Sequence, residues 1–390
     1  MNALKMAMNI LIDIRPLMDR RYSGVAEYTH ELLKALLNID QQNQYWLLYN
    51  SFHNVSDRLP LFNYPNVSII RTKYPNKFFN YVLLKFLHRP YFDKIVGQPI
   101  DIFFMPHINF ARWSPSITSI VTVHDISFVH FPKFFNWRKN LWHGLLSVKK
   151  LLKRSRIVVT LSENTQNDVK QYAHLDDTRT TTIYSGISDV FTILNKEDST
   201  LEVVKQKYNL PDSFIFFLGT IEPRKNIEGL IKAFEIVKSK QASDLKLVIA
   251  GGRGWKARPV FQAAAISQCA DDIIFLDYVE ASEKVALYNL ATMFVYPSFY
   301  EGFGFPPLEA MACGTPTIVS ATSSLPEVVG DGAVMIDPYN PTSIATAIFE
   351  ILHDASLRSR LIEKGKEQAA KFTWEKTAEK YLNLFVSVKK

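Results

Sequence analysis

The residues best suited to chemistry lie in two stretches of the second half of the chain. Residues 296–314 read YPSFYEGFGFPPLEAMACG, and residues 217–226 read FLGTIEPRKN. In the first stretch a strand ends near Pro297, a glycine-rich loop follows, and a helix begins at Pro306 and Pro307, where proline is tolerated. Glycines let backbone N–H groups approach a ligand, and a helix N-terminus adds free N–H groups and a positive dipole end. The pattern therefore predicts a phosphate-binding site.

Two carboxylates, Glu301 and Glu309, lie on either side of this phosphate site. A carboxylate aimed at a phosphate would be repelled, so both are better assigned to hydroxyl groups, one on a sugar and one on a ribose. The alternative is that Glu309 stabilises the first turn of its helix and that Glu301 is a solvated loop residue.

Two adjacent cations, Arg224 and Lys225, follow the strand of the second stretch and precede a helix. Cations at the end of a strand can neutralise the charge that develops on a departing nucleoside diphosphate. Arginine does this with two hydrogen bonds and lysine as a point charge. Taken alone, such a pair is usually solvated surface; its interest comes from the phosphate site that follows in the same half of the chain.

Apolar runs of strand length alternate with helical patterns along almost the whole chain, which predicts an α/β fold with two doubly wound, Rossmann-like parallel sheets. A polar stretch at 186–213 separates the two series. Ligands of such sheets bind at the carboxyl ends of the strands. The predicted strands are 9–14, 45–49, 67–71, 100–105, 119–123, 156–161 and 180–184 in the first half, and 214–219, 246–251, 273–278, 293–298 and 316–320 in the second.

The bulk composition fits a two-domain globular protein of 390 residues with a formal net charge of +7. That charge suits an anionic partner without naming it. The two cysteines exclude a disulfide framework and a cysteine-rich metal site. We find no convincing signal peptide and no stretch long enough to span a membrane, so a cytoplasmic protein is expected.

Several motifs in order resemble the large retaining glycosyltransferase family numbered four, which has the GT-B fold with an interdomain cleft. EPRKN is followed by EGFGFPPLEAMACGTP, and SGVAEYTHELL (23–33), VHD (123–125), LSENTQNDV (161–169), IYSGISDVF (183–191) and FLDYV (275–279) also match. The resemblance implies an acceptor-side domain at 1–190, a nucleotide-sugar-binding domain at 191–371 and a C-terminal helix at 372–390 that crosses back to the first domain.

Carried over residue by residue, the family pattern assigns the donor site. Arg224 and Lys225 would bind the diphosphate, Glu301 the hydroxyls of the transferred sugar and Glu309 the ribose. The remaining donor-binding residues would be the loop with its backbone N–H groups, the two residues over the phosphates and the two near the base: Gly302, Phe303, Gly304, Phe305, Pro307, Leu308, Tyr278 and Val279.

The resemblance also implies roles for two residues of the first half. Gly24 would let the first domain close on the donor, and His124 would support positive charge at the anomeric carbon. Without the resemblance, His124 is more simply a hydrogen-bonded histidine that ends a buried strand. The chain has Ser23-Gly24 where many relatives have two glycines, which could alter closure. The resemblance implies no covalent nucleophile, because the reaction mechanism of the family is front-face displacement.

No metal is expected at the site. An Asp-x-Asp pair that would bind a divalent ion beneath the diphosphate is absent from the ends of the predicted strands, and Arg224 and Lys225 can supply the charge instead. The expected enzyme is therefore a metal-independent hexosyltransferase without a cofactor, using a nucleotide diphosphate sugar as substrate.

Two basic and aromatic segments of the first half, 71–94 and 133–156, suit an anionic membrane surface. The alternatives are nucleic acid, which we do not expect, and an ordinary helix whose apolar stripe is in the core. Membrane contact would place the protein peripherally on the inner face of the plasma membrane. The acceptor would then be a glycan on a polyprenyl diphosphate lipid, as in O-antigen or other lipopolysaccharide biosynthesis.

The segment GTIEPRKN (219–226) resembles the corresponding segment of mannosyltransferases that use GDP-mannose. This resemblance favours GDP-mannose as the donor over UDP-glucose, UDP-galactose or UDP-N-acetylglucosamine. Two further classes stay open. A nicotinamide-dependent oxidoreductase would need G-x-G-x-x-G after the first strand, and residues 21–28, RYSGVAEY, lack it. A non-catalytic basic protein that binds membrane or nucleic acid would not need Arg224, Glu301 and Glu309 together.

Overall fold

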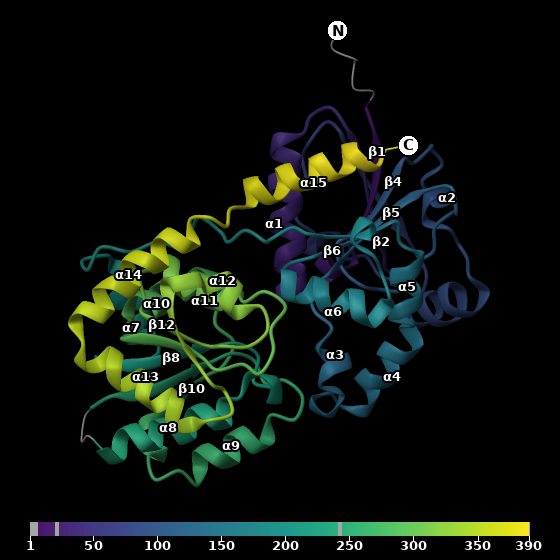
Figure 1. Cartoon of the computed structure of the whole chain (residues 1–390). Helices are drawn as coiled ribbons and strands as arrows, with labels where there is room; N and C mark the ends of the chain where they lie inside the picture. The colour runs from purple at the N-terminus through teal and green to yellow at the C-terminus, as the bar shows by residue number, and fades with distance from the viewer. Residues whose placement is uncertain (1–6, 20–22, 241–243, 390) are drawn as a thin grey trace. The chain divides into compact units, whose positions relative to one another are not determined.

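The computed structural model in Figure 1 describes residues 7–19, 23–240 and 244–389. The chain forms two compact units. Unit 1 comprises residues 1–126, 138–186 and 374–390, and unit 2 comprises residues 127–137 and 187–373. Within the described ranges, no helix is both long enough and apolar enough to span a bilayer.

The described part of unit 1 is built on a parallel sheet of seven strands in the order β3-β2-β1-β4-β5-β6-β7. Three of its strands, β4, β5 and β6, are buried at every position because helices cover both faces of the sheet. The strands are β1 (Asn9–Asp13), β2 (Gln44–Asn50), β3 (Val67–Thr72), β4 (Ile102–Met105), β5 (Thr118–Val123), β6 (Ile157–Thr160) and β7 (Thr180–Thr182). The main helices are α1 (Gly24–Ile39), η3 (Phe78–Leu87), α2 (Phe92–Val96), α4 (Trp137–Leu146), α5 (Val148–Arg154), α6 (Glu163–Ala173) and α15 (Trp374–Val388).

The described part of unit 2 has a second parallel sheet, with six strands in the order β10-β9-β8-β11-β12-β13. The strands are β8 (Phe214–Leu218), β9 (Lys246–Ala250), β10 (Ile273–Leu276), β11 (Met293–Tyr296), β12 (Thr317–Ser320) and β13 (Ala333–Ile336). The helices are α3 (Ser127–His130), α7 (Ser199–Lys207), α8 (Ile227–Lys240), α9 (Arg258–Ala265), α10 (Ala281–Leu290), α11 (Phe305–Ala312), α12 (Leu325–Val329), α13 (Pro341–His353) and α14 (Ala355–Ala369). The prediction of two doubly wound sheets is confirmed.

The last helix, α15, belongs to unit 1 although it follows unit 2 in the chain. It packs against α1 and crosses it in Figure 1, where the two helices are drawn in yellow and purple. Its buried face carries Tyr381 and Phe385, and the Tyr381 hydroxyl shares hydrogen bonds of 2.7 Å with the hydroxyls of Tyr28 and Thr122. The chain therefore passes between the units four times, after residues 126, 137, 186 and 373.

One segment differs from the predicted domain 1–190: residues 127–137 pack with unit 2. Phe134 stacks on Phe299 with ring centroids 5.7 Å apart, and Phe135 stacks on Trp255 at 5.5 Å. Trp255 Nε1 also donates a 2.8 Å hydrogen bond to the Phe134 carbonyl. Both phenylalanines are half-buried by these contacts with unit 2, and the membrane contact expected for the segment 133–156 stays a prediction.

Candidate active site

The topology of unit 2 brings together three of the four predicted catalytic residues, Arg224, Lys225 and Glu301. The chain runs from β8 outward to β9 and β10, then returns to β11 on the other side of β8. Loops that leave two neighbouring strands in opposite directions open a crevice at the carboxyl edge of the sheet. Arg224 and Lys225 follow β8 in a short 3-10 helix, η6 (Pro223–Lys225), and Glu301 follows β11.

Glu301 is held between the two cations. Arg224 Nη1 donates to Glu301 Oε2 at 2.7 Å, and Lys225 Nζ donates to Glu301 Oε1 at 2.6 Å. Arg224 Nη1 also donates to the Tyr300 carbonyl at 2.7 Å, and Lys225 Nζ donates to the Tyr296 hydroxyl. The side chains predicted to bind diphosphate and sugar therefore form one hydrogen-bonded cluster.

This cluster is buried, and its carboxylate Glu301 is ionised. Glu301 and Lys225 are each 7% exposed. Burial by itself would raise the pKa of Glu301, but the neighbouring Arg224 and Lys225 lower it to about 2. The alternative in which Glu301 is a solvated loop residue is therefore wrong.

The glycine-rich loop after β11 is shaped by one position that only glycine fits. Gly304 has φ 112°, and a Cβ there would lie 2.7 Å from Cδ2 of Leu325. Ser324 Oγ fixes the loop by hydrogen bonds to the carbonyls of Glu301 at 3.0 Å and Phe303 at 2.9 Å. Gly302, Phe303 and Gly304 thus lead into α11, which begins at Phe305, and Pro307 and Leu308 lie buried in its first turns. The contact of these residues with the donor stays a prediction.

Glu309 is the fifth residue of α11 and is 5% exposed. Its Oε2 accepts a 2.8 Å hydrogen bond from the Tyr288 hydroxyl. No acidic residue occupies the first turn of this helix, so the alternative in which Glu309 stabilises that turn is wrong. Its proposed contact with ribose stays a prediction.

Tyr278 and Val279 follow β10, the edge strand two places from β8. They lie at the same carboxyl edge as Arg224, and Val279 is buried. The loop after β9, the strand between β8 and β10, contacts the end of β10, because Gly251 N donates to the Leu276 carbonyl at 3.2 Å. The contact of Tyr278 and Val279 with the base stays a prediction, and it requires the base to bind at this carboxyl edge.

His124 ends β5 in unit 1, and its ring orientation is fixed. Its Nε2 must carry a proton, because it lies 2.9 Å from the Pro106 carbonyl, which can only accept. The ring meets that of Tyr28 edge-on, with centroids 4.7 Å apart. Burial lowers the pKa of His124, so the imidazole is neutral at pH 7.

Comparison with known proteins decides the family. The family model "Glycosyltransferase Family 4" matches residues 22–190, and "Glycosyl transferases group 1" matches residues 199–368. O-antigen chain mannosyltransferase B of Escherichia coli is 32% identical over 298 residues, which cover 76% of this chain and 75% of that protein.

The chain belongs to glycosyltransferase family 4. The serotype-specific mannosyltransferase WbdA of Escherichia coli is 34% identical over 232 residues, but these cover 58% of this chain and 28% of that longer protein. Sucrose-phosphate synthase from Thermosynechococcus elongatus has the same fold, with a TM-score of 0.75, 19% identity and coverage of 98% and 99% of the two chains. Anabaena Alr3699/HepE in complex with UDP and glucose gives a TM-score of 0.71 at 14% identity, covering 98% of this chain and 100% of that one. The oxidoreductase and the non-catalytic alternatives are thereby excluded.

Sequence reasoning missed one member of this transferase's charged cluster. Glu222 is 2% exposed, and its Oε1 accepts hydrogen bonds from Arg224 Nη2 at 2.8 Å and Nε at 3.1 Å. Its other oxygen, Oε2, is buried without a hydrogen-bond partner in the part of the chain that the structure describes. Glu222 could have been selected from the sequence, because it is the first residue of the EPRKN motif. With Glu222 included, two cations face two carboxylates, so the cluster carries no net charge before a ligand binds.

Two further features of the glycosyltransferase were not selected from the sequence. Gly251 has φ 141°, and a Cβ there would lie 2.0 Å from the Gly219 carbonyl oxygen, so glycine is required where the loops after β8 and β9 meet. In unit 1, Arg15 Nη2 forms a buried 2.6 Å ion pair with Asp13 Oδ2 at the end of β1 and donates to the Phe110 carbonyl at 2.7 Å. This pair ties together the loops after β1 and β4, the two strands at which the connections of unit 1 diverge.

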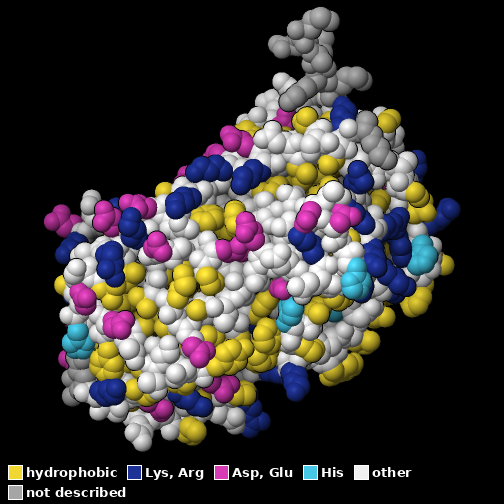
Figure 2. Space-filling model, in the orientation of Figure 1, with side chains coloured by type: hydrophobic (Ala, Val, Ile, Leu, Met, Phe, Trp, Pro, Cys, Tyr) yellow, Lys and Arg dark blue, Asp and Glu magenta, His cyan; other side chains and the backbone are white. Residues whose placement is uncertain are grey.

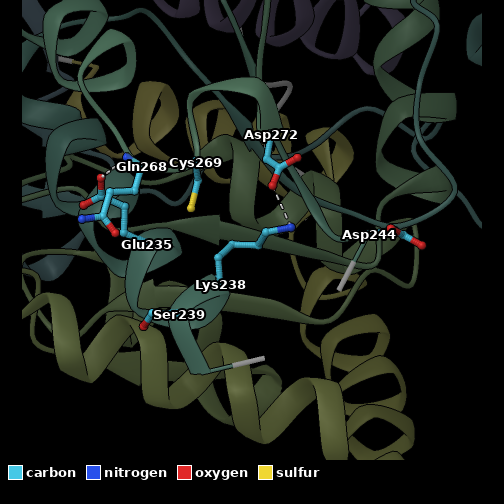
Figure 3. A pocket seen from close by; sticks show the side chains of 7 residues that line it. All are labelled: Glu235, Lys238, Ser239, Asp244, Gln268, Cys269 and Asp272. Carbon is cyan, nitrogen blue, oxygen red and sulfur yellow. Dashed lines mark hydrogen bonds and ion pairs between the residues drawn. The ribbon is translucent and has the colours of Figure 1, made fainter. Parts of the chain in front are cut away.

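A second hollow of unit 2 lies at the opposite edge of its sheet (Figure 3), beside the first residues of β9 and β10. Across it, Lys238 Nζ pairs with Asp272 Oδ2 at 2.7 Å. It is lined by Glu235, Lys238, Ser239, Asp244, Gln268, Cys269 and Asp272. Because Arg224 and Glu301 lie at the carboxyl edge, we assign this hollow no part in the transfer.

Gly24 offers a test that separates ligand contact from packing. It is the first residue of α1, and an added Cβ would meet nothing within 4 Å. Gly24→Ala should therefore leave the melting temperature unchanged within about 2 °C. If the backbone at Gly24 meets the donor, transfer should fall by about tenfold or more, because the methyl group displaces the donor from its reactive position. Parallel thermal melts and transfer rates measure both effects, and an unchanged rate would contradict this role for Gly24.

Proposed function

We propose that this glycosyltransferase moves a mannosyl residue from GDP-mannose to a growing, lipid-linked surface polysaccharide, with retention of the anomeric configuration. The observation that carries the proposal is the cluster of Arg224, Lys225 and Glu301 beside the tip of α11. The choice of mannose is supported by relatives named as O-antigen mannosyltransferases.

The donor diphosphate would bind where cations and backbone N–H groups converge. Pro306 and Pro307 have no N–H, so the N–H groups at the tip of α11 are those of Gly304 and Phe305. Arg224 and Lys225 would stabilise the negative charge that grows on the diphosphate as the bond to the sugar breaks.

Glu301 would orient the sugar. Each of its carboxylate oxygens already accepts one hydrogen bond from a cation and retains a lone pair for a sugar hydroxyl. Its low pKa keeps it ionised and therefore an acceptor throughout the working pH range.

The transfer needs no covalent enzyme intermediate. In front-face displacement the bond from the anomeric carbon to the phosphate oxygen breaks while the bond to the acceptor oxygen forms on the same face. The acceptor proton passes to the departing phosphate oxygen. Positive charge develops at the anomeric carbon, and a neutral His124 would tolerate it, whereas an imidazolium would repel it.

A screen of sugar nucleotides tests the donor. GDP-mannose is expected to bind and to be turned over at least about tenfold better than UDP-glucose, UDP-galactose or UDP-N-acetylglucosamine, since a site built for one base and sugar leaves polar groups unpaired with another. Saturation binding and product release are the measurements. Preference for any UDP-sugar would replace the mannosyl assignment with a UDP-hexose-dependent transfer.

Metal independence gives a second test of the chemistry. Since Arg224 and Lys225 would supply the positive charge for the leaving diphosphate, turnover is expected to survive excess EDTA with less than about a twofold change. Loss of turnover in EDTA, restored by magnesium or manganese, is the result that would contradict this.

The acceptor is proposed to reside at the inner face of the plasma membrane, with the enzyme bound peripherally in the cytoplasm. This rests on the basic segment 71–94 and on the part of the segment 133–156 that lies in unit 1. Figure 2 shows lysine and arginine side chains gathered, with hydrophobic and histidine side chains beside them, over the region where α5 and α2 are labelled in Figure 1.

A further inference from the structure

Unit 1 contains a cationic hollow that the transfer chemistry does not use. It lies between η3, the loop before β5 and α5, and its volume is about 260 Å³. Its wall carries four cations, Lys85, Arg112, Lys150 and Arg154, and also His88. The residues that line it include no aspartate or glutamate.

Three of the four cations are fixed by neutral partners. Lys85 Nζ donates to Ser147 Oγ at 2.8 Å, and Arg112 Nε donates to the Leu84 carbonyl at 2.9 Å. Arg154 donates to the Trp113 carbonyl, and its guanidinium lies 4.4 Å from the centroid of the Trp113 ring. These contacts orient the charges without neutralising them.

Asp93 is an acid whose charge acts on Arg154, but it does not line the hollow and its carboxylate is bound to Ser114. Its carboxylate accepts hydrogen bonds from the Ser114 N–H at 2.8 Å and the Ser114 hydroxyl at 2.5 Å. Burial, followed by the charges of Lys150 and Arg112, lowers the pKa of Lys85. The like charges thus repel one another, and an anion in the hollow would relieve the repulsion.

An apolar helix face adjoins the hollow. The helix η3, which contributes Lys85, leaves Phe86 68% exposed and Leu87 61% exposed, with Phe78 and Val82 exposed along the same helix. Four cations beside exposed apolar side chains match an amphiphile with a highly charged head. A phosphodiester lipid brings one negative charge, whereas a diphosphate bridge brings two.

We propose that the hollow between η3 and α5 binds the diphosphate of the lipid that carries the acceptor glycan, with the exposed side chains of η3 against the bilayer. The proposal deepens the function proposed above and rests on it for the identity of the lipid. Lys85 and Lys150 come from segments far apart in the sequence, so the site exists only in the folded unit.

Vesicle binding tests the proposal without any sugar transfer. The probes are phosphatidylcholine vesicles doped with undecaprenyl diphosphate, and phosphatidylcholine vesicles doped with phosphatidylglycerol to the same total charge. The full-length protein is expected to bind the diphosphate vesicles at least about fivefold more tightly, the effect of about one additional cation contact near the surface. Equal binding to the two compositions would overturn the proposal in favour of a general anionic surface.

A matched pair of double variants locates the site. Lys85→Gln/Lys150→Gln removes two cations of the hollow, whereas Lys149→Gln/Lys153→Gln removes two lysines of α5 that do not line it. The first pair should weaken binding to diphosphate vesicles by about twentyfold or more, and the second by clearly less. Equal losses would overturn the proposal.

The assay stays informative if one variant is unstable or if the donor assignment fails. Lys150 is exposed, so the single variant Lys150→Gln is expected to fold and to lose about fivefold in binding, against no preferential loss for Lys149→Gln. The vesicles carry no donor, so a negative result here would leave mannosyl transfer standing. A failed donor screen would likewise leave the vesicle result readable.

Discussion

Changing Glu301 to glutamine is expected to reduce kcat/KM for transfer by about a hundredfold or more, while GDP binds at least as tightly as to the wild-type protein. Glutamine keeps the shape of Glu301 but removes the charge between Arg224 and Lys225. The sugar loses its ionised acceptor, so transfer falls. The two cations lose an internal anion, so they are freer to pair with the diphosphate of GDP. Opposite changes in turnover and product affinity are the distinctive result.

The same substitution should destabilise the protein without ligand. Removing one partner of a buried ion pair costs about 3–5 kcal/mol, because the remaining charges stay buried and uncompensated. Glu222 remains as a negatively charged partner of Arg224, so we expect the loss in unfolding free energy to lie at the low end of that range. Added GDP supplies the missing negative charge, so the gap in Tm between variant and wild type should narrow on saturation with GDP.

The control is Glu283→Gln in the same unit. Glu283 pairs with Lys207 at 2.5 Å, and half of the Lys207 side chain is exposed to solvent. This change should cost about 1 kcal/mol or less and should not respond to GDP. Thermal melts, calorimetric GDP titration and initial rates of transfer measure the three quantities. An unaltered transfer rate in a folded Glu301→Gln protein would remove Glu301 from the site.

The strands of both sheets were predictable because parallel sheets need continuous apolar runs. The missed strand, β13, shows the limit of that signal. It has four residues, AVMI, at the edge of the sheet, and Met335 is 40% exposed. An edge strand of this length needs no long buried run, so pairing with β12 defines it, and pairing is not visible in a single sequence.

The residues that form the site could be predicted from the sequence, but the balance of charges among them could not. Spacing and motif selected Arg224, Lys225 and Glu301, and the sheet order then explains why they meet. The neutral balance with Glu222 could not be read from the sequence, because a glutamate two residues before an arginine is equally compatible with solvent. Likewise, the aromatic residues of 133–156 were predictable as a group, but not the division that places Phe134 in unit 2 and Trp142 against Phe110 in unit 1.

Arg224→Ala is expected to abolish most transfer and to alter the acid stability of the protein in a defined direction. Arg224 links Glu222, Glu301 and the Tyr300 carbonyl, so its removal takes away both the charge for the leaving diphosphate and the orientation of Glu301. A loss of about a thousandfold in kcat is the expected scale for removing one such preorganised group. Lysine at this position should restore only part of the rate, because an ammonium cannot reproduce the fork of hydrogen bonds.

The acid dependence follows from the low pKa of Glu301. A glutamate in an unfolded chain has a pKa of about 4.3, whereas Arg224 and Lys225 hold the pKa of Glu301 at about 2 in the folded protein. A carboxylate with a lowered folded pKa contributes stability that is present above the unfolded value and is lost as the pH falls toward the folded value. The difference corresponds to about 3 kcal/mol at neutral pH, part of which belongs to Arg224.

Urea unfolding from pH 7 to pH 3 therefore separates this electrostatic role from simple packing. The stability gap between wild type and Arg224→Ala should be largest near neutral pH and should shrink steadily below about pH 4.3. Arg358→Ala is the matched control. Among the described residues, the Arg358 side chain donates to the carbonyls of Ile351 and Leu352 and to no carboxylate, so its gap should not vary with pH. A gap for Arg224→Ala that stays constant or widens on acidification would mean that Glu301 is not held ionised by Arg224, and the proposed binding of the diphosphate by this cluster would have to be abandoned.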